Sequence, residues 1–267
     1  MKKPIRFALS TVAAAMIGAA FLSSAHAGPL IVNGGFESGF SSWTRLDQLG
    51  SDGSFSLQTG TLSPVNNDPV PAPPEGTIAA MTDAQGPGSH VLYQDFVVPP
   101  TGATLSFDLF IGNRADAFVT PATLDFSTPA LNQQARVDIM LSSADPFSVV
   151  ASDVLLNLYQ TNVGDPLISG YATHTIDLTA LFAAHAGETL RLRFAETDNV
   201  FTFQLGVDDV RLGTTSVPEP ASTLLFGAAL AALLARRGAT RRKVVVPPPR
   251  MYRNGADAGA GSGHGGS

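Results

Sequence analysis

The sequence contains the residue types that perform acid–base and metal chemistry, but none of them stands in a catalytic spacing. His90, His174 and His185 lack the short separations of metal ligands, and no Gly-x-Ser-x-Gly elbow, phosphate loop or His-Glu-x-x-His motif occurs. Cysteine is absent, which excludes a disulfide framework, a thiolate zinc site and a cysteine nucleophile. A pair of catalytic carboxylates for glycoside hydrolysis remains an alternative, because aspartate is abundant. Solvent-exposed acidic surfaces and carboxylates that cap loops explain these aspartates more simply. We therefore expect a protein that is not an enzyme.

Charge is distributed unevenly along the chain and argues against nucleic-acid binding. The net charge is −6, and all three lysines (Lys2, Lys3 and Lys243) lie near the two ends. Residues 28–216 hold six arginines and twenty acidic residues, a balance of −14. A surface of this sign repels phosphate backbones and suits divalent cations, while solubility alone also explains it.

Between the two ends, hydrophobic residues alternate with polar ones, which is the period of half-buried β-strands. The clearest runs are Leu105–Ile111, Val137–Leu141 and Leu190–Phe194. Four further strands complete the expected set: Val91–Val98, Val154–Gln160, Tyr171–Ile176 and Phe201–Leu212.

The segments between these strands favour antiparallel sheets. No predicted helix is long enough to cross between parallel strands, because Thr179–His185, closed by Gly187, predicts only a short helical turn. Thr59–Thr77 contains five prolines and predicts a long surface loop. We predict an all-β domain over residues 28–215, built as an antiparallel two-sheet β-sandwich.

Residues 1–27 have the three parts of a secretory signal peptide. A short basic region precedes an apolar stretch from Phe7 to Leu22. Ala25 and Ala27 flank His26 in the small-x-small pattern that predicts cleavage after Ala27. An uncleaved membrane anchor is the alternative.

The C-terminal end has a proline break, a short apolar run and a basic cluster, in that order. The break consists of Val217, Pro218, Glu219 and Pro220, and the basic cluster consists of Arg236, Arg237, Arg241, Arg242 and Lys243. A helix over the intervening run, residues 221–235, is about 22 Å long, shorter than the roughly 30 Å hydrocarbon core of a bilayer. We predict a single, marginally transmembrane helix whose basic end stays in the cytoplasm, with the preceding domain outside the inner membrane.

This order of features resembles the PEP-CTERM sorting domain of proteins exported by many Gram-negative bacteria. The resemblance covers residues 216–243 and implies recognition by an exosortase, a membrane-embedded transpeptidase that resembles cysteine proteases. The exosortase would process the chain near Glu219, after a transient stay in the inner membrane, and release the domain to the cell surface or the medium. Family members are associated with extracellular polysaccharide and biofilm matrix. A plain C-terminal membrane anchor is the alternative.

Residues 244–267 continue past the basic cluster, where proteins with this motif usually end. Three consecutive prolines at 247–249 and a glycine-rich end predict a disordered tail.

A second resemblance links the start and the end of the predicted domain. Asn33-Gly34-Gly35-Phe36-Glu37, followed by Trp43, resembles the opening of jelly-roll domains of the carbohydrate-binding-module and galactose-binding-like type. Gly206–Leu212 resembles the last strand of that group. The resemblance implies a jelly roll with a core tryptophan at Trp43 and a structural Ca²⁺ between the first and last strands.

Two acidic residues fit such a calcium site. Asp208 shares the core-facing side of the last strand with Val210 and Leu212, and a buried carboxylate requires a partner. Calcium prefers several oxygen ligands, including carboxylates. Glu37 and Asp208 are therefore the candidate ligands. Capping of backbone amides, or pairing with arginine, is the alternative.

Together these features predict an exported, non-enzymatic structural or interaction protein of the cell surface or extracellular matrix. Its expected partners are the secretion machinery, an exosortase and extracellular polysaccharide. A secreted carbohydrate-binding module is the first alternative, although Tyr93, Tyr159 and Tyr171 are scattered and each is more often packing than ligand. Sugar contact through Tyr93 or Tyr171 would favour that module. A glycan-active enzyme is the second alternative.

Overall fold

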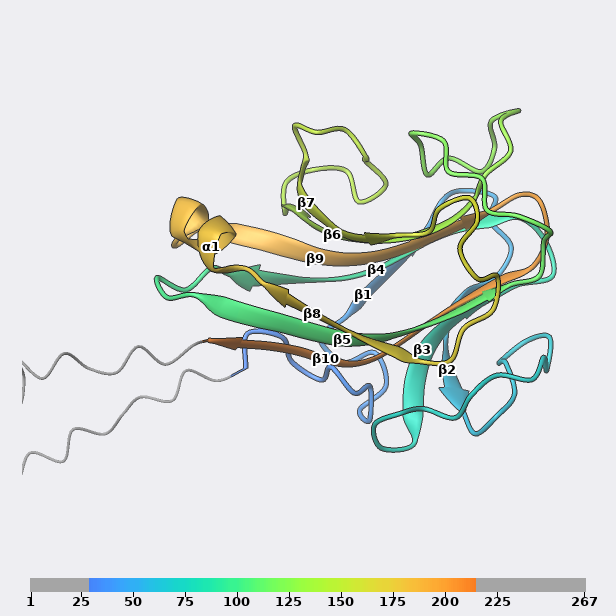
Figure 1. Cartoon of the computed structure of the whole chain (residues 1–267), viewed down its shortest axis with the longest axis horizontal. Helices are drawn as coiled ribbons and strands as arrows, with labels where there is room; N and C mark the ends of the chain where they lie inside the picture. Colours follow the sequence, from blue (N-terminus) through green and yellow to red (C-terminus); the bar gives the residue numbers. More distant parts are fainter. Residues whose placement is uncertain (1–28, 215–267) are drawn as a thin grey trace, which may run out of the picture. The chain divides into compact units, whose positions relative to one another are not determined.

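The computed structural model describes residues 29–214, which form a sandwich of two antiparallel five-stranded sheets with one short helix (Figure 1). The first sheet has the order β1 (Thr44–Asp47), β4 (Gly88–Val97), β9 (Thr189–Asp198), β6 (Gln133–Leu141) and β7 (Val154–Gln160). The second has the order β2 (Ser54–Thr59), β3 (Ile78–Asp83), β10 (Phe203–Thr214), β5 (Ala103–Asn113) and β8 (Ala172–Asp177). The helix is α1 (Thr179–His185).

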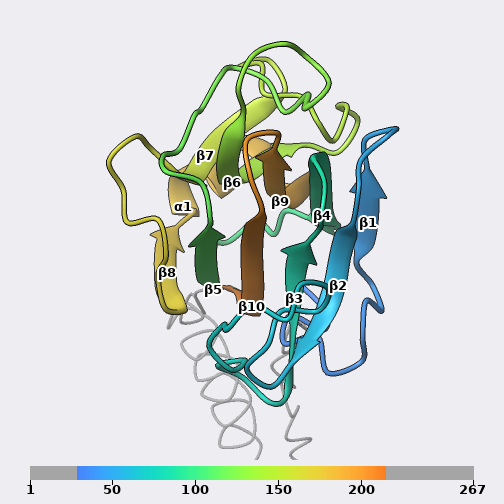
Figure 2. The same ribbon diagram turned by 90° about the vertical axis from the view of Figure 1, so that its right-hand side faces the viewer.

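From β3 onward the chain crosses repeatedly between the two sheets. β3, β5, β8 and β10 belong to the second sheet, whereas β4, β6, β7 and β9 belong to the first. This path, with eight strands shared equally between two packed sheets, is a jelly roll. The last strand, β10, consequently lies inside its sheet between β3 and β5 (Figure 2).

The all-β sandwich predicted from the sequence is confirmed, and each of the seven expected strands overlaps one of the observed strands. The short helix at α1 and the long loop before β3 are confirmed as well. Three strands escaped prediction. These strands are β1, β2 and β3. β1 is exposed along its whole length, and β3 is buried on both faces after its first residue, so neither shows the alternation that identifies a half-buried strand.

The inward faces of the sheets form one hydrophobic core. Leu105, Phe107 and Leu109 of β5 face it with Phe194 of β9, and none of these side chains is more than 1% exposed. Trp43 packs 5.2 Å from Phe36 and 6.0 Å from Phe194, measured between ring centroids. The expected core role of Trp43 is therefore confirmed.

The N-terminal segment packs directly against β10 through a glycine. The backbone N–H of Val210 donates to the carbonyl of Gly34 at 3.1 Å. A Cβ atom at Gly34 would lie 1.9 Å from the carbonyl oxygen of Val210, so only glycine permits this approach.

Loops cover much of both outer faces. On the first sheet, Leu124 and Phe147 from two long loops pack with Val91 and Ala195. On the second, Val70 of the proline-rich loop packs against Phe110 of β5, which is fully buried although it lies on the outer side of its strand. The sheets therefore offer little flat, open surface.

The core predicts a clear difference between two phenylalanines. Phe194→Ala should lower the free energy of unfolding by about 3–5 kcal/mol, because it leaves a cavity between Trp43 and Phe107. Phe201→Ala should change it by less than about 0.5 kcal/mol, because that ring is 62% exposed. Urea unfolding of the two variants measures both values, and equal losses would contradict this description of the core.

Candidate functional site

The two predicted calcium ligands bind the same short segment before β3. Glu37 Oε1 accepts hydrogen bonds from the N–H groups of Thr77 at 2.6 Å and Ile78 at 2.8 Å. Asp208 Oδ2 accepts from the N–H of Glu75 at 3.0 Å. The structure thus brings Glu37 and Asp208 to one place, where they cap backbone amides, as the alternative interpretation of the sequence held.

Asp208 does not face the core, contrary to the expectation from strand alternation. Val207, Val210 and Leu212 all belong to the core cluster, so the alternation breaks between 207 and 210. The pairing of β10 with β5 shifts register between Asp208 and Arg211, and Asp209 there has a φ of 49°. This β-bulge reverses the faces and turns Asp208 outward, beneath the proline-rich loop.

The chemistry around Asp208 fits a cation, but its geometry does not form a complete metal site. Burial raises the pKa of Asp208 to about 7, and the charges of Glu75 and Asp209 act in the same direction. A cation beside this carboxylate would favour its charged form. Nevertheless, no group of three or more acidic, histidine or cysteine side chains within residues 29–214 is arranged to hold a metal ion. The calcium site stays a prediction.

The predicted sorting and processing residues lie outside the described residues. These are Ala25 and Ala27 of the signal peptide, Val217, Pro218, Glu219 and Pro220 of the break, and Arg236, Arg237, Arg241, Arg242 and Lys243 of the basic cluster. The expected membrane helix over residues 221–235 also falls there. Among residues 29–214, no helix has the length and hydrophobicity to cross a membrane.

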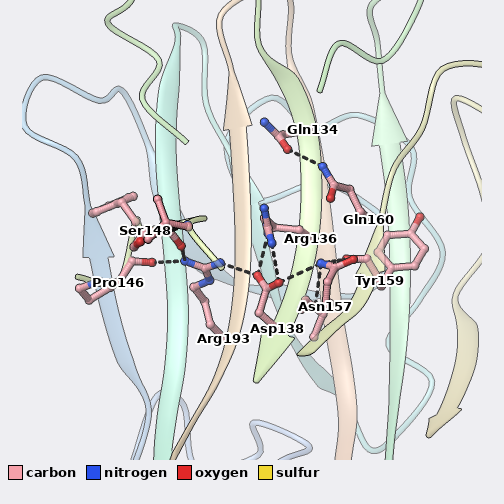
Figure 3. Close-up of polar contacts among 12 residues, drawn as sticks. Gln134, Arg136, Asp138, Pro146, Ser148, Asn157, Tyr159, Gln160 and Arg193 are labelled. Atoms are coloured by element: carbon pink, nitrogen blue, oxygen red, sulfur yellow. Dashed lines mark hydrogen bonds and ion pairs between the residues drawn. The ribbon is translucent and has the colours of Figure 1, made fainter. Parts of the chain in front are cut away.

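A buried ionic cluster occupies the outer face of the first sheet (Figure 3). Arg136 of β6 donates two 2.7 Å hydrogen bonds to the carboxylate of Asp138 on the same strand. Arg193 of β9 donates to Asp138 at 2.5 Å. Burial opposes ionisation of Asp138, but the two arginines outweigh it and hold the pKa of that carboxyl below its ordinary value.

The same arginine fastens a loop over this face. Arg193 Nη1 donates to the carbonyls of Pro146 and Ser148, each at 2.6 Å, and the side chain is fully buried. Nearby, Arg191 donates to the carbonyl of Ser142 at 2.8 Å and stacks over Tyr93 at 4.0 Å. The loop therefore covers the buried pair of Arg193 and Asp138 on this side of the first sheet.

A second buried carboxyl, that of Glu196, has a raised pKa, whereas the pKa of Asp138 is lowered. Glu196 of β9 points between the sheets, is 1% exposed, and its Oε1 has no hydrogen-bond partner in the part of the chain that the structure describes. Burial raises the pKa of Glu196 well above its ordinary value, and the charge of Asp198 adds to this effect. Glu196 is therefore held in its neutral form.

Two of the three tyrosines considered for sugar contact are unavailable as platforms. Tyr93 lies beneath Arg191, and Tyr171 donates a 2.8 Å hydrogen bond to Gln58 while packing on Phe110. Tyr159 is different, because it lies on the edge strand β7 and its ring points away from the Asp138 cluster (Figure 3).

Tyr159 forms one wall of an open groove between the edges of the two sheets, which we call the lateral groove. Its volume is about 270 Å³. Leu109 and Ile111 of β5 form the floor, and His174 of the edge strand β8 adjoins Tyr159 in the same wall. The loop joining β7 to β8 supplies the rim, with Asp165 and Ser169. Figure 2 shows β7 and β8 at the same side of the sandwich.

The groove presents rings and unsatisfied polar atoms together. The rings of Tyr159 and His174 meet edge to face at 5.0 Å, and His174 stacks on Phe107 at 5.3 Å. Neither the Tyr159 hydroxyl nor the His174 nitrogens form a hydrogen bond with any residue between 29 and 214. Burial raises the pKa of Tyr159 to about 12, and burial lowers the pKa of His174.

Sequence reasoning named both ring residues but did not bring them together. Tyr159 and His174 belong to strands of different sheets, and their meeting depends on both strands being edges on the same side. The other two histidines within residues 29–214 are engaged elsewhere. His90 contacts Asp47 at 2.7 Å, and His185 contacts Glu188 at 2.9 Å.

Comparison with known proteins identifies the sorting segment. Residues 216–242 match the family model of the PEP-CTERM protein-sorting motif. The chain therefore carries a PEP-CTERM sorting motif at its C-terminus, the mark of a protein exported by an exosortase system in Gram-negative bacteria. No curated protein sequence matches the chain.

Solved structures similar to this chain are β-sandwich domains of the carbohydrate-binding-module type and related chains. One is TmCBM61, solved in complex with β-1,4-galactotriose, at 10% identity and a TM-score of 0.41, covering 71% of this chain and 100% of that one. Another is the Stig cyclase Fisc from Fischerella sp. TAU, at 19% identity and a TM-score of 0.42, covering 71% and 98%. A third is the K3 cleaved adhesin domain of Lys-gingipain from Porphyromonas gingivalis, at 16% identity and a TM-score of 0.40, covering 66% and 93%. At this distance the likeness concerns the sandwich alone.

If calcium binds at Asp208, it should stabilise the native domain. At a calcium concentration of 100 times Kd, the gain is about 2.7 kcal/mol, which raises Tm by several degrees. Thermal unfolding with calcium and with a chelator measures the shift, and Asp208→Asn should abolish it. Identical melting of the natural protein in the two buffers would rule out the calcium site.

Replacing each of the two buried carboxyls by the corresponding amide should have effects on stability of very different size. Asp138→Asn should lower the free energy of unfolding by about 3–5 kcal/mol, because it leaves Arg193 buried without its counter-charge. Glu196→Gln should cost less than about 1 kcal/mol, because the native carboxyl is already neutral. Denaturant unfolding at pH 7 compares them.

Acid should remove this difference. The pKa of Asp138 is lowered on folding, so its contribution is present above the unfolded value near 3.8 and is lost as pH falls through the lower folded value. A gap between the two variants that is as large at pH 2 as at pH 7 would contradict the assignment.

Proposed function

We propose that this protein is sorted by an exosortase-type system, after transient membrane insertion, to the cell surface or extracellular matrix. There its sandwich has a non-enzymatic structural or interaction role. The observation that carries this proposal is the match of residues 216–242 to the sorting motif, immediately after the last strand ends at Thr214.

The position of that last strand supports removal of everything that follows it. β10 lies inside the second sheet, paired with β5 from Phe203 to Thr214 and with β3 at Gly206 and Val207. Processing near Glu219 would come after this strand and would take no hydrogen-bonded residue out of either sheet. The released product would therefore keep all the strands of the sandwich.

The placement of the perturbed carboxyls supports a non-enzymatic role. Glu196 and Asp208 are at most 1% exposed and are out of reach of a substrate. Burial raises the pKa of Asp198 to about 7, and this residue lines a cavity of about 170 Å³. No second acidic side chain lines that cavity, whereas glycoside hydrolysis requires two carboxyl groups.

Deleting the sorting segment tests export and sorting without removing any strand of the sandwich. Removing residues 217–243 should abolish delivery to the surface or medium and leave the product in the periplasm, because the exosortase has no motif to recognise. Cell fractionation and immunoblotting measure location, and intact mass of the exported form locates the cut. The matched control removes the tail at 244–267, which should leave sorting unchanged.

Three results would contradict the proposal. One is unchanged surface delivery after deletion of residues 217–243 in cells that contain an exosortase. Another is a mature exported form that still carries Arg236 to Lys243. Normal delivery of the natural protein in cells without an exosortase would also exclude this route.

A further inference from the structure

We propose that the lateral groove binds a single neutral pyranoside unit of an extracellular glycan, with Tyr159 and His174 as the contacting side chains. This inference rests on the proposed function, because it names the ligand class of the exported domain. It places the ligand at the side of the sandwich, between the edge strands β7 and β8, and not on the outer face of either sheet.

The size of the groove sets the size of the ligand. About 270 Å³ is slightly below the range of about 300–1,000 Å³ in which drug-sized ligands bind. The groove is open along one side, so a single ring fits while the rest of a chain extends into solvent. Its floor is apolar, since Leu109 and Ile111 are core residues with 1% and 4% exposure.

The walls match the two kinds of surface that a sugar ring carries. A pyranose ring presents C–H groups on its faces, which pack on aromatic rings and apolar floors, and hydroxyl groups around its rim. Tyr159 and His174 provide the rings, and Leu109 and Ile111 provide the apolar floor. A purely apolar ligand would leave the polar atoms of the walls without partners, which is costly.

The polar atoms can both donate and accept hydrogen bonds, as hydroxyl groups require. The Tyr159 hydroxyl is a donor and an acceptor. Burial lowers the pKa of His174, and the nearby Asp108 only partly offsets this, so the imidazole is neutral at pH 7 and offers one donor and one acceptor. Asp165 has one carboxylate oxygen engaged by the N–H of Asn162 at 2.7 Å, which leaves the other available.

The charge of the groove selects against acidic sugars. Asp165 lies close enough to raise the pKa of Tyr159, and Asp108 acts on His174 from behind the sheet. No lysine or arginine lines the groove to neutralise a uronate, sulfate or phosphate group. A neutral pyranoside is therefore favoured over a charged one of the same size.

The proposal is tested on the full chain, purified in a detergent that has no sugar headgroup, so that the result does not depend on export. The probes are the methyl β-glycosides of glucose, galactose and N-acetylglucosamine, with glucuronic acid as the charged comparison. Saturation-transfer NMR should detect at least one neutral glycoside with a Kd in the millimolar range, as a single ring held by a few contacts allows. Glucuronic acid should bind at least about tenfold more weakly.

Matched tyrosine variants identify the site. Tyr159→Phe removes only the hydroxyl and should weaken binding about three- to tenfold. Tyr93→Phe makes the same change beneath Arg191 on the other side of the first sheet and should leave binding unchanged. His174→Phe keeps a ring but removes both nitrogens and should also weaken binding. Thermal unfolding of each variant checks that the fold is retained.

Three outcomes would overturn the inference: no binding of any of the three neutral glycosides, equal binding of glucuronic acid, or equal effects of Tyr159→Phe and Tyr93→Phe. Any of them would leave the sorting proposal intact, because delivery is measured in cells with the natural chain. Loss of sorting on deleting residues 217–243, conversely, would not alter binding by the purified protein.

Discussion

The jelly-roll path is the constraint on which the rest of the structure depends. The chain crosses repeatedly from one sheet to the other, so β3 and β5 belong to the same sheet but are not joined directly. The last strand, β10, lies between them and pairs with both. The N-terminal segment then bonds to β10 where Gly34 meets Val210. Both ends of the described chain are thus tied to one strand. The sorting motif begins at residue 216, after this strand ends at Thr214.

Loops that ionic groups hold in place cover much of both outer faces. Arg193 and Asp138 form a buried pair on the first sheet, and the same arginine holds the backbone of a loop. On the second sheet, Asp83 and Asp208 accept N–H groups of the proline-rich loop. These carboxylates accept hydrogen bonds from loop N–H groups that have no neighbouring strand to pair with, and so stabilise the irregular backbone of the loop. The side of the sandwich between β7 and β8 is left as an accessible groove.

Much of the fold could be predicted because burial repeats locally. In β5 and β9, every second residue faces the core, and this period is visible in the sequence before any partner strand is known. β3 could not be found in this way because a loop also buries its outer face. Asp208 was assigned to the wrong face because one extra residue in a bulge reverses the alternation after it.

Two kinds of feature can be read along the chain without the fold. The sorting motif depends on the order of its residues, and most of the strands follow from the alternation of neighbouring residues, whereas the core role of Trp43 came from the family resemblance. Which side chains meet across the sheets is set by the packing of the folded chain. Tyr159 and His174 face one groove because two edge strands lie at the same side of the sandwich, and no local pattern records that pairing. Local periodicity encodes burial, whereas the meeting of distant strands is set by how the whole chain packs.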